Sequence, residues 1–139
     1  MWERYSHDYD LNAKVVSMGM LTAGEDGENF LLTDDIYADR DLLLIDESHN
    51  LRNVGTQRYA LVADYMAGDP NRRCCLLTAT PRNKTFWNVF NQIKLFHPED
   101  TTDLPLEPAD LRKFFAKIEK QERNLPDLLQ RFVVILRQD

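Results

Sequence analysis

Two short apolar runs constrain the fold of this chain more than any other feature. Leu42–Ile45 and Cys74–Leu77 each place four apolar side chains in succession, a pattern typical of strands buried on both faces of a parallel sheet. Between them, Gly55–Ala67 carries apolar residues at helical spacing and is followed by Gly68-Asp69-Pro70, which predicts a helix with a stop signal. Strand, helix and strand in this order predict a parallel crossover unit and therefore an α/β fold.

Shorter elements are expected toward both ends of the chain. Lys14–Met18 is β-branched and apolar, and the turn-forming stretch Gly24–Gly27 follows it, so this pattern predicts a short strand. Glu28–Tyr37 is expected to form a short helix. A helix over Leu125–Gln130 and a strand over Phe132–Leu136 are expected to end the chain.

Helices are expected after the second apolar run. Thr85–Phe96 places its aromatic and aliphatic side chains on one helical face, whereas Thr101–Pro108, with two prolines and no periodicity, predicts a loop. Pro108 suits the first turn of the helix that follows. The apolar residues of that helix recur at helical spacing and are Leu111, Phe114, Phe115 and Ile118.

Size and composition indicate one modest core. At 139 residues, 43% of them hydrophobic, the chain is expected to form one domain or part of one. No apolar run approaches the roughly 20 residues of a membrane-spanning helix, so neither secretion nor membrane insertion is indicated. Cys74 and Cys75 are adjacent and are expected to point to opposite faces of a strand. We expect both to be reduced, which suits a cytoplasmic location.

An acidic pair, Asp46-Glu47, directly follows the first apolar run. In open parallel sheets, ligands bind at the carboxyl ends of the strands. At that position Asp46 can hold magnesium, and Glu47 can orient or deprotonate the water that attacks a terminal phosphate. Taken alone, the pair has a second interpretation, in which the two acids solvate the strand end and cap the following segment.

A second motif, at the end of the next strand, makes the acidic pair more specific. Ile45–Asn53 (IDESHNLRN) followed by Leu76–Asn83 (LLTATPRN) closely resembles motifs two and three of superfamily-two helicases, especially the Swi/Snf-type group of double-stranded DNA translocases. Val15–Met18 is similar to the strand that bears motif Ib, and Leu128–Val134 to the segment that closes the first motor domain. The resemblance implies a partial RecA-like parallel sheet with flanking helices.

The resemblance also implies a role for each matching residue of the first motif. It implies that Asp46 coordinates magnesium and that Glu47 activates the attacking water. It implies that His49 couples the nucleotide to the nucleic acid. These three residues are the candidate metal-binding and catalytic residues of the chain.

In the second motif, the resemblance places Thr78 and Thr80 in a hydroxyl network that relays the phosphate state to the bound strand. Hydroxyl groups suit this relay because they both donate and accept hydrogen bonds. Strand-end and helix-capping chemistry is the alternative interpretation of both threonines. Ser17 and Arg82 are the candidate nucleic-acid contacts.

The phosphate loop that such an ATPase needs is missing from the sequence. Its pattern, G-x-x-x-x-G-K-[ST], does not occur, and Lys84-Thr85 has Thr78 and Asn83 at the two glycine positions. The family's usual paired arginines near the end of domain one are replaced by Ile135-Leu136-Arg137. We therefore expect residues 1–139 to be a fragment, covering about the last two thirds of a first motor domain and lacking its upstream phosphate-loop strand and helix.

ATP and magnesium are the cofactors expected for the complete protein, and nucleic acid, most of all double-stranded DNA, is the expected partner. The remainder of the motor, namely the phosphate-loop segment and a second RecA-like domain, is expected to bind this chain as well. The isolated chain is expected to be inactive and to bind no cofactor tightly, because phosphoryl transfer depends on positioning. A cytoplasmic or nucleoid-associated location fits this interpretation.

Two other classes of protein remain open. The net charge is −6, but the window from Pro70 to Pro98 contains no acid. A non-catalytic nucleic-acid- or protein-binding domain derived from a motor would use the Arg72 to Lys94 part of this window, or the helix over Leu111 to Ile118, as its contact surface. Such basic windows also arise by chance on a solvated face. An unrelated metal-dependent phosphohydrolase would need ligands besides Asp46 and Glu47, whereas His7 and His97 are isolated. The basic residues of the window are Arg72, Arg73, Arg82, Lys84 and Lys94.

Overall fold

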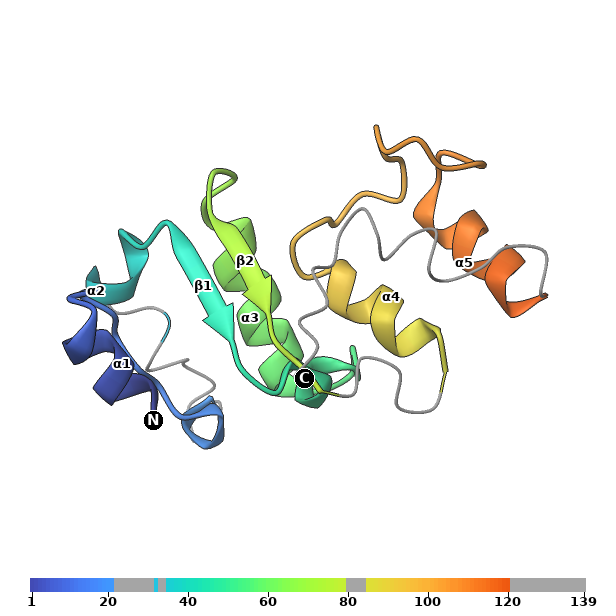
Figure 1. The fold of residues 1–139 in the computed structure, drawn as a ribbon. Coiled ribbons are helices and arrows are strands. Elements are labelled where there is room, and N and C mark those ends of the chain that lie inside the picture. The colour runs from blue at the N-terminus through green and yellow to red at the C-terminus, as the bar shows by residue number, and fades with distance from the viewer. Residues whose placement is uncertain (22–31, 33–34, 80–84, 121–139) are drawn as a thin grey trace.

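A computed structural model describes residues 1–21, 32, 35–79 and 85–120 of the chain. In Figure 1, α1 and α2 lie beside β1, whereas α4 and α5 lie beyond β2. The elements in chain order are α1 (Trp2–Asp8), the 3-10 turn η1 (Met18–Met20), α2 (Asp35–Ala38), β1 (Leu42–Ile45), the 3-10 turn η2 (Ser48–Leu51), α3 (Gln57–Ala67), β2 (Arg73–Leu76), α4 (Trp87–Ile93) and α5 (Leu111–Glu119).

The two strands form a small parallel sheet, as the sequence predicts. The register pairs Leu42 with Arg73 and Ile45 with Leu76, and the ladder continues for one more bond, since Leu77 N donates to Ile45 O at 2.8 Å. Parallel strands need a crossover connection, and α3 provides it. The fold is therefore mixed α/β with flanking helices, consistent with part of a RecA-like domain.

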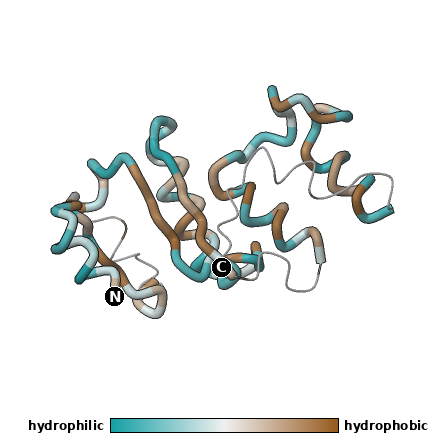
Figure 2. The backbone as a smooth tube through the Cα atoms, viewed as in Figure 1, coloured by the Kyte–Doolittle hydropathy of each residue, from teal (hydrophilic) through white to brown (hydrophobic). Residues whose placement is uncertain are grey.

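In the described part of the chain, strand β1 is buried on one face only, so the prediction that it is buried on both faces is wrong, whereas Cys74, Cys75 and Leu76 of β2 are all half-buried. Leu43 and Ile45 face the hydrophobic cluster that contains Tyr59 and Val62 of α3. Side chains alternate along a strand, and the neighbouring Leu42 and Leu44 are 57% and 41% exposed. Figure 2 shows hydrophobic residues along both strands. Helix α3 packs against one face of the sheet.

Helix α3 begins where its first turn is capped. The Thr56 side chain accepts a hydrogen bond from Tyr59 N at 3.3 Å, which satisfies one of the free amides at the helix start. The helix ends at Ala67, before Gly68. The prediction of a helix over Gly55–Ala67 is therefore confirmed, with a start two residues later than expected. Its buried residues are Tyr59, Val62, Tyr65 and Met66.

A buried arginine fastens the region before β1 to the end of α3. The Arg72 side chain is 8% exposed and donates to Arg40 O at 2.9 Å and Ala38 O at 2.7 Å, as well as to Tyr65 O. Its guanidinium also lies 3.8 Å from the centre of the Tyr65 ring. The carbonyls at helix C-termini lack partners within the helix and carry partial negative charge, so a cation stabilises them without any acidic partner.

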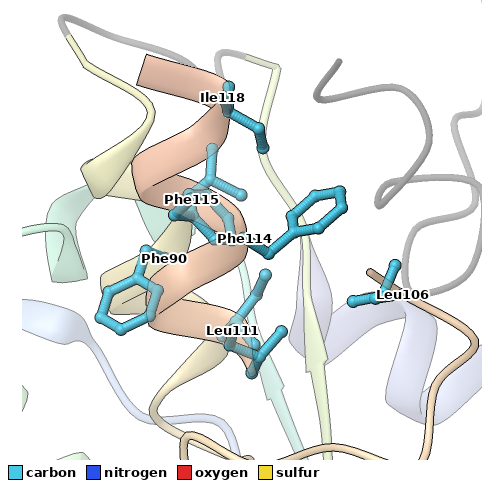
Figure 3. Packing of buried hydrophobic residues seen from close by; sticks show 8 residues of the cluster. Phe90, Leu106, Leu111, Phe114, Phe115 and Ile118 are labelled. Atoms are coloured by element: carbon cyan, nitrogen blue, oxygen red, sulfur yellow. The ribbon is translucent and has the colours of Figure 1, made fainter. Parts of the chain in front are cut away.

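Helices α4 and α5 pack through aromatic side chains. The Phe90 ring lies 5.1 Å from Trp87 and 5.3 Å from Phe115, edge to face in both pairs, a favourable arrangement of aromatic rings. Figure 3 shows Leu106, on the loop before α5, beside the apolar side chains that project from this helix. The buried residues of this cluster are Val89, Phe90, Ile93, Leu106, Leu111, Phe114, Phe115 and Ile118.

Both helices differ slightly from their predicted bounds. The helix expected over Thr85–Phe96 is shorter, because α4 spans Trp87–Ile93. Helix α5 starts after Asp110, whose side chain accepts a hydrogen bond from Lys113 N at 2.8 Å. Pro108 therefore lies before the cap, and its predicted place in the first turn is wrong. The loop expected over Thr101–Pro108 is confirmed, with an isolated bridge between Thr101 and Asp110 at its ends.

The strand predicted over Lys14–Met18 is wrong. Ser17 instead accepts a hydrogen bond from Gly19 N at 3.3 Å and caps the turn η1. A serine side chain that bonds its own neighbouring backbone favours a turn over a sheet ladder, and Val16 and Met18 pack against the cluster around β1 and α3.

Three further predictions concern the ends of the chain and the cysteines. Helix α2 spans Asp35–Ala38, whereas most of the helix expected from Glu28 onward lies outside the described residues, as do the elements expected over 125–136. Cys74 and Cys75 are free thiols, as expected, and burial, together with the neighbouring Cys75, raises the pKa of Cys74 to about 12. No helix among the described residues has the length and apolar character needed to span a membrane.

Candidate active site

The two predicted motifs meet at the carboxyl edge of the sheet. Asp46 and Glu47 follow β1 directly, and Thr78 lies two residues beyond the end of β2. The Ser48 amide donates to Leu77 O at 2.9 Å, so the turn after β1 is bound to the segment after β2. In Figure 1, both strands point toward this edge, which is where open parallel sheets bind ligands.

The Asp46 carboxylate is exposed and held from both sides. Its Oδ1 accepts a hydrogen bond from Glu47 N at 2.9 Å, and its Oδ2 accepts one from Trp2 Nε1 at 2.8 Å. An ionised carboxylate can accept about four hydrogen bonds, so each oxygen retains accepting capacity. No sequence pattern pointed to Trp2, because a tryptophan near the N-terminus gives no signal of a contact with residue 46.

Glu47 and His49 form a pair on the same turn. Glu47 adopts a left-handed backbone conformation, with φ of 50° and ψ of 47°, which is uncommon for a residue with a side chain and clusters at functional sites. Its Oε2 lies 3.1 Å from His49 Nδ1, and the same ring nitrogen lies 3.4 Å from Thr78 Oγ1. His49 therefore joins the first motif to the second.

Behind this exposed edge, Ser48 and Gln92 form a buried hydrogen bond. Ser48 is fully buried and donates from Oγ to Gln92 Oε1 at 2.7 Å, and Gln92 Nε2 donates to Asn88 O at 3.1 Å. Burial of these polar groups is tolerated because each has a partner. The sequence interpretation missed Gln92, although a polar residue between Val89 and Ile93, on the apolar face of α4, was an available signal.

A second chain of hydrogen bonds ties the turn to two helices. Arg52 Nη1 donates to His49 O at 2.9 Å, and Asn91 Nδ2 donates to Arg52 O at 2.8 Å. The Tyr59 hydroxyl of α3 completes the chain by donating to Asn91 O at 2.7 Å, and burial raises the pKa of Tyr59. The backbone that carries Glu47 and His49 is thus fixed by α3 and α4.

The structure bears on only some of the other predicted contact residues. Thr80 and Arg82 are outside the described residues, and Ser17 caps the turn η1. Of the basic window, Arg72 is buried against backbone carbonyls, and Lys94 binds Asp100 Oδ1 at 2.8 Å with its side chain 16% exposed. These two cations are engaged within the protein, so the window is less basic at the surface than its composition suggests.

The donor set at the sheet edge fits magnesium that is shared with phosphate groups. No group of three or more histidines, cysteines or acids capable of holding a metal occurs within the described residues. Magnesium commonly binds one or two carboxylates together with waters and substrate phosphates, and the exposed Asp46 carboxylate meets this requirement.

Sequence comparison supports a relationship between this chain and an ATP-dependent helicase. The chain is 30% identical over 94 residues to a protein of Bacillus subtilis strain 168 described as the uncharacterised ATP-dependent helicase YqhH. The match covers 68% of this chain but 16% of YqhH, so the chain spans about a sixth of this relative. No family model matches the chain, and no solved structure matches it.

Proposed function

We propose that this chain contributes the water-activating part of an ATP-dependent helicase or DNA translocase motor. The observation that carries the proposal is the meeting of both motifs at one sheet edge, with His49 Nδ1 3.1 Å from Glu47 Oε2 and 3.4 Å from Thr78 Oγ1. The helicase relative supports the same class of protein. The proposal includes three assignments: the chain is part of a motor domain, its nucleotide is ATP, and its partner is double-stranded DNA.

In the proposed reaction, Glu47 orients a water molecule and accepts its proton during attack on the terminal phosphate of ATP. His49 holds the Glu47 carboxylate when Nδ1 carries a proton, and its contact with Thr78 links that carboxylate to the second motif. Asp46 is the residue that would hold magnesium, which supplies neutralisation of phosphate charge when bound. Asp46 is exposed and directly follows the carboxyl end of β1.

The remaining parts of the proposal concern nucleic acid and the rest of the motor. Thr80 is proposed to extend the hydroxyl relay from Thr78, and Ser17 and Arg82 are proposed to contact the nucleic-acid backbone. A phosphate-loop segment and a second RecA-like domain are proposed to complete the nucleotide site. A cytoplasmic or nucleoid-associated location follows from this activity.

The proposal predicts that the purified chain has no DNA-stimulated ATPase activity, because it lacks a phosphate-loop pattern. A chimera in which the chain replaces the matching region of YqhH should regain this activity. In that chimera Glu47→Gln should lower kcat by about 100-fold or more, the scale of general-base catalysis. Phosphate release with and without duplex DNA measures both expectations.

Glu99→Gln is the matched control, since Glu99 is exposed and lies outside both motifs, and it should leave kcat unchanged. A chimera that hydrolyses ATP equally well with and without Glu47→Gln would contradict the proposed role of Glu47. Robust turnover by the isolated chain, lost in Glu47→Gln, would contradict the requirement for a separate phosphate-loop segment.

A further inference from the structure

The N-terminal helix α1 reaches the Asp46 carboxylate through one side chain. Trp2 Nε1 donates to Asp46 Oδ2 at 2.8 Å, across 44 residues of sequence. The Trp2 ring also lies 6.0 Å from Tyr5, whose ring lies 6.1 Å from Tyr9. This aromatic row runs along α1 and begins at the contact with Asp46.

The segment after α1 is also tied to the sheet side of the molecule. Ala13 N donates to Ser6 Oγ at 3.1 Å, which folds the chain back along α1. Arg40, which lies two residues before the start of β1, donates from Nη1 to Asn12 O at 3.2 Å. The bond of Trp2 to Asp46 and the bond of Arg40 to Asn12 therefore both connect this N-terminal segment to the region around β1.

We propose that Trp2 is a positioning residue that holds the Asp46 carboxylate in the orientation needed to bind a divalent cation. The inference rests on the proposed function, because it assumes that Asp46 is a metal ligand. Carboxylates that bind metals are themselves held by hydrogen bonds from neighbouring groups, and these neighbours tune the affinity for the metal. Trp2 on Oδ2 and the Glu47 amide on Oδ1 are two such donors.

The indole of Trp2 can orient the Asp46 carboxylate without competing with a metal ion for it. An indole N–H is a single neutral donor, so it uses one lone pair of Oδ2 and leaves the carboxylate its charge. The basic side chains of α1 are directed elsewhere, since Arg4 Nε and His7 Nδ1 lie 3.4 and 3.5 Å from the Asp8 carboxylate. Among the described residues, no basic side chain of α1 forms an ion pair with Asp46.

Magnesium titration of the ¹⁵N-labelled chain tests the inference, with the Glu47 amide resonance as the reporter beside Asp46. Trp2→Phe keeps the aromatic ring but removes the donor, and it should raise the Kd for magnesium about 10-fold, the lower end for loss of such a neighbour. Trp87→Phe is the matched control, since Trp87 belongs to the α4–α5 cluster, and it should leave the Kd unchanged. Equal melting temperatures of Trp2→Phe and the unchanged chain would separate this effect from a loss of structure.

Manganese provides a second readout, because the broadening it causes depends on the distance between the bound ion and each reporter group. A paramagnetic ion on Asp46 should broaden the Trp2 indole resonance far more than the Trp87 indole resonance, because the Trp2 indole donates a hydrogen bond to that carboxylate, whereas Trp87 packs against the α4–α5 cluster. An unchanged or lower Kd for magnesium in Trp2→Phe would overturn the inference while leaving the proposed function in place. If Asp46→Asn left the magnesium response of Glu47 unchanged, the metal role of Asp46 would fail, and the inference with it.

Discussion

At the scale of single residues, Arg72 and Gln92 show how polar groups are buried in this chain. Arg72 binds three backbone carbonyls, and Gln92 binds Ser48 Oγ and Asn88 O. Neither side chain has a charged partner. The bonds of Arg72 to Ala38 O and Arg40 O, and the bond of Gln92 to Ser48, connect segments that are distant in sequence. Since an unpaired buried polar group costs about 1–3 kcal/mol, each of these side chains helps to fix one arrangement of the elements.

Arg72→Met should lower the free energy of unfolding by about 3 kcal/mol, because the carbonyls of Ala38, Arg40 and Tyr65 lose a charged donor. Urea denaturation followed by circular dichroism measures the change. Arg73→Met is the control, since the neighbouring Arg73 is exposed, and it should change the same free energy by less than about 0.5 kcal/mol. Similar effects of the two substitutions would show that the bonds of Arg72 contribute little.

At the scale of the elements, side-chain caps decide where helices begin. Thr56 caps α3 and Asp110 caps α5, each by accepting a hydrogen bond from the amide three residues later. The apolar spacing revealed that these helices exist, whereas the caps determined their first residues. Pro108 shows the difference, because a proline that suits a first turn lies before the cap when Asp110 takes that position.

Asp110→Ala should destabilise the chain by about 1 kcal/mol, the usual effect of losing an N-cap, because Lys113 N loses its acceptor. Asp110→Asn should restore most of this stability, since asparagine caps helices about as well. Asp103→Ala, at an exposed position in the preceding loop, is the control for the loss of one negative charge. The midpoints of urea denaturation compare the variants, and equal midpoints for Asp110→Ala and Asp103→Ala would argue against the cap.

At the scale of the whole molecule, α4 and the residues directly after it contribute to two hydrophobic clusters. Val89, Phe90 and Ile93 belong to the cluster with α5, whereas Leu95, just after α4, belongs to the cluster with β1 and α3. The hydrogen bonds from Gln92 to Ser48 and from Asn91 to Arg52 also extend from α4 to the site. The site is thus held by a helix whose own position depends on both clusters.

Phe115→Ala should therefore destabilise both clusters together. Phe115 is fully buried, and removal of a buried phenylalanine side chain costs about 3–5 kcal/mol. In a Trp2→Phe background, the fluorescence of Trp87 reports on the α4–α5 cluster and circular dichroism on all helices, and both should give one lowered midpoint. Two separate transitions would show that the clusters unfold independently, and Tyr9→Ala, at a site 68% exposed, should have little effect.

The sequence by itself determined the strand–helix–strand order, the parallel pairing that this order requires, and the place of Asp46 and Glu47 at a strand end. These features depend on local periodicity and on the order of elements, which a sequence displays directly. The apolar face of α5 was predictable for the same reason.

The tertiary structure alone decided which face of β1 is buried, where Arg72 binds, and how Trp2 and Gln92 reach the site. Leu42 and Leu43 are chemically identical. Because α3 packs on one face of β1, Leu43 packs against the hydrophobic cluster while Leu42 stays exposed. The contacts of Trp2 with Asp46 and of Ser48 with Gln92 each span 44 residues. Such pairings are set by how the elements pack in space, because no local pattern of side chains encodes a partner at that separation.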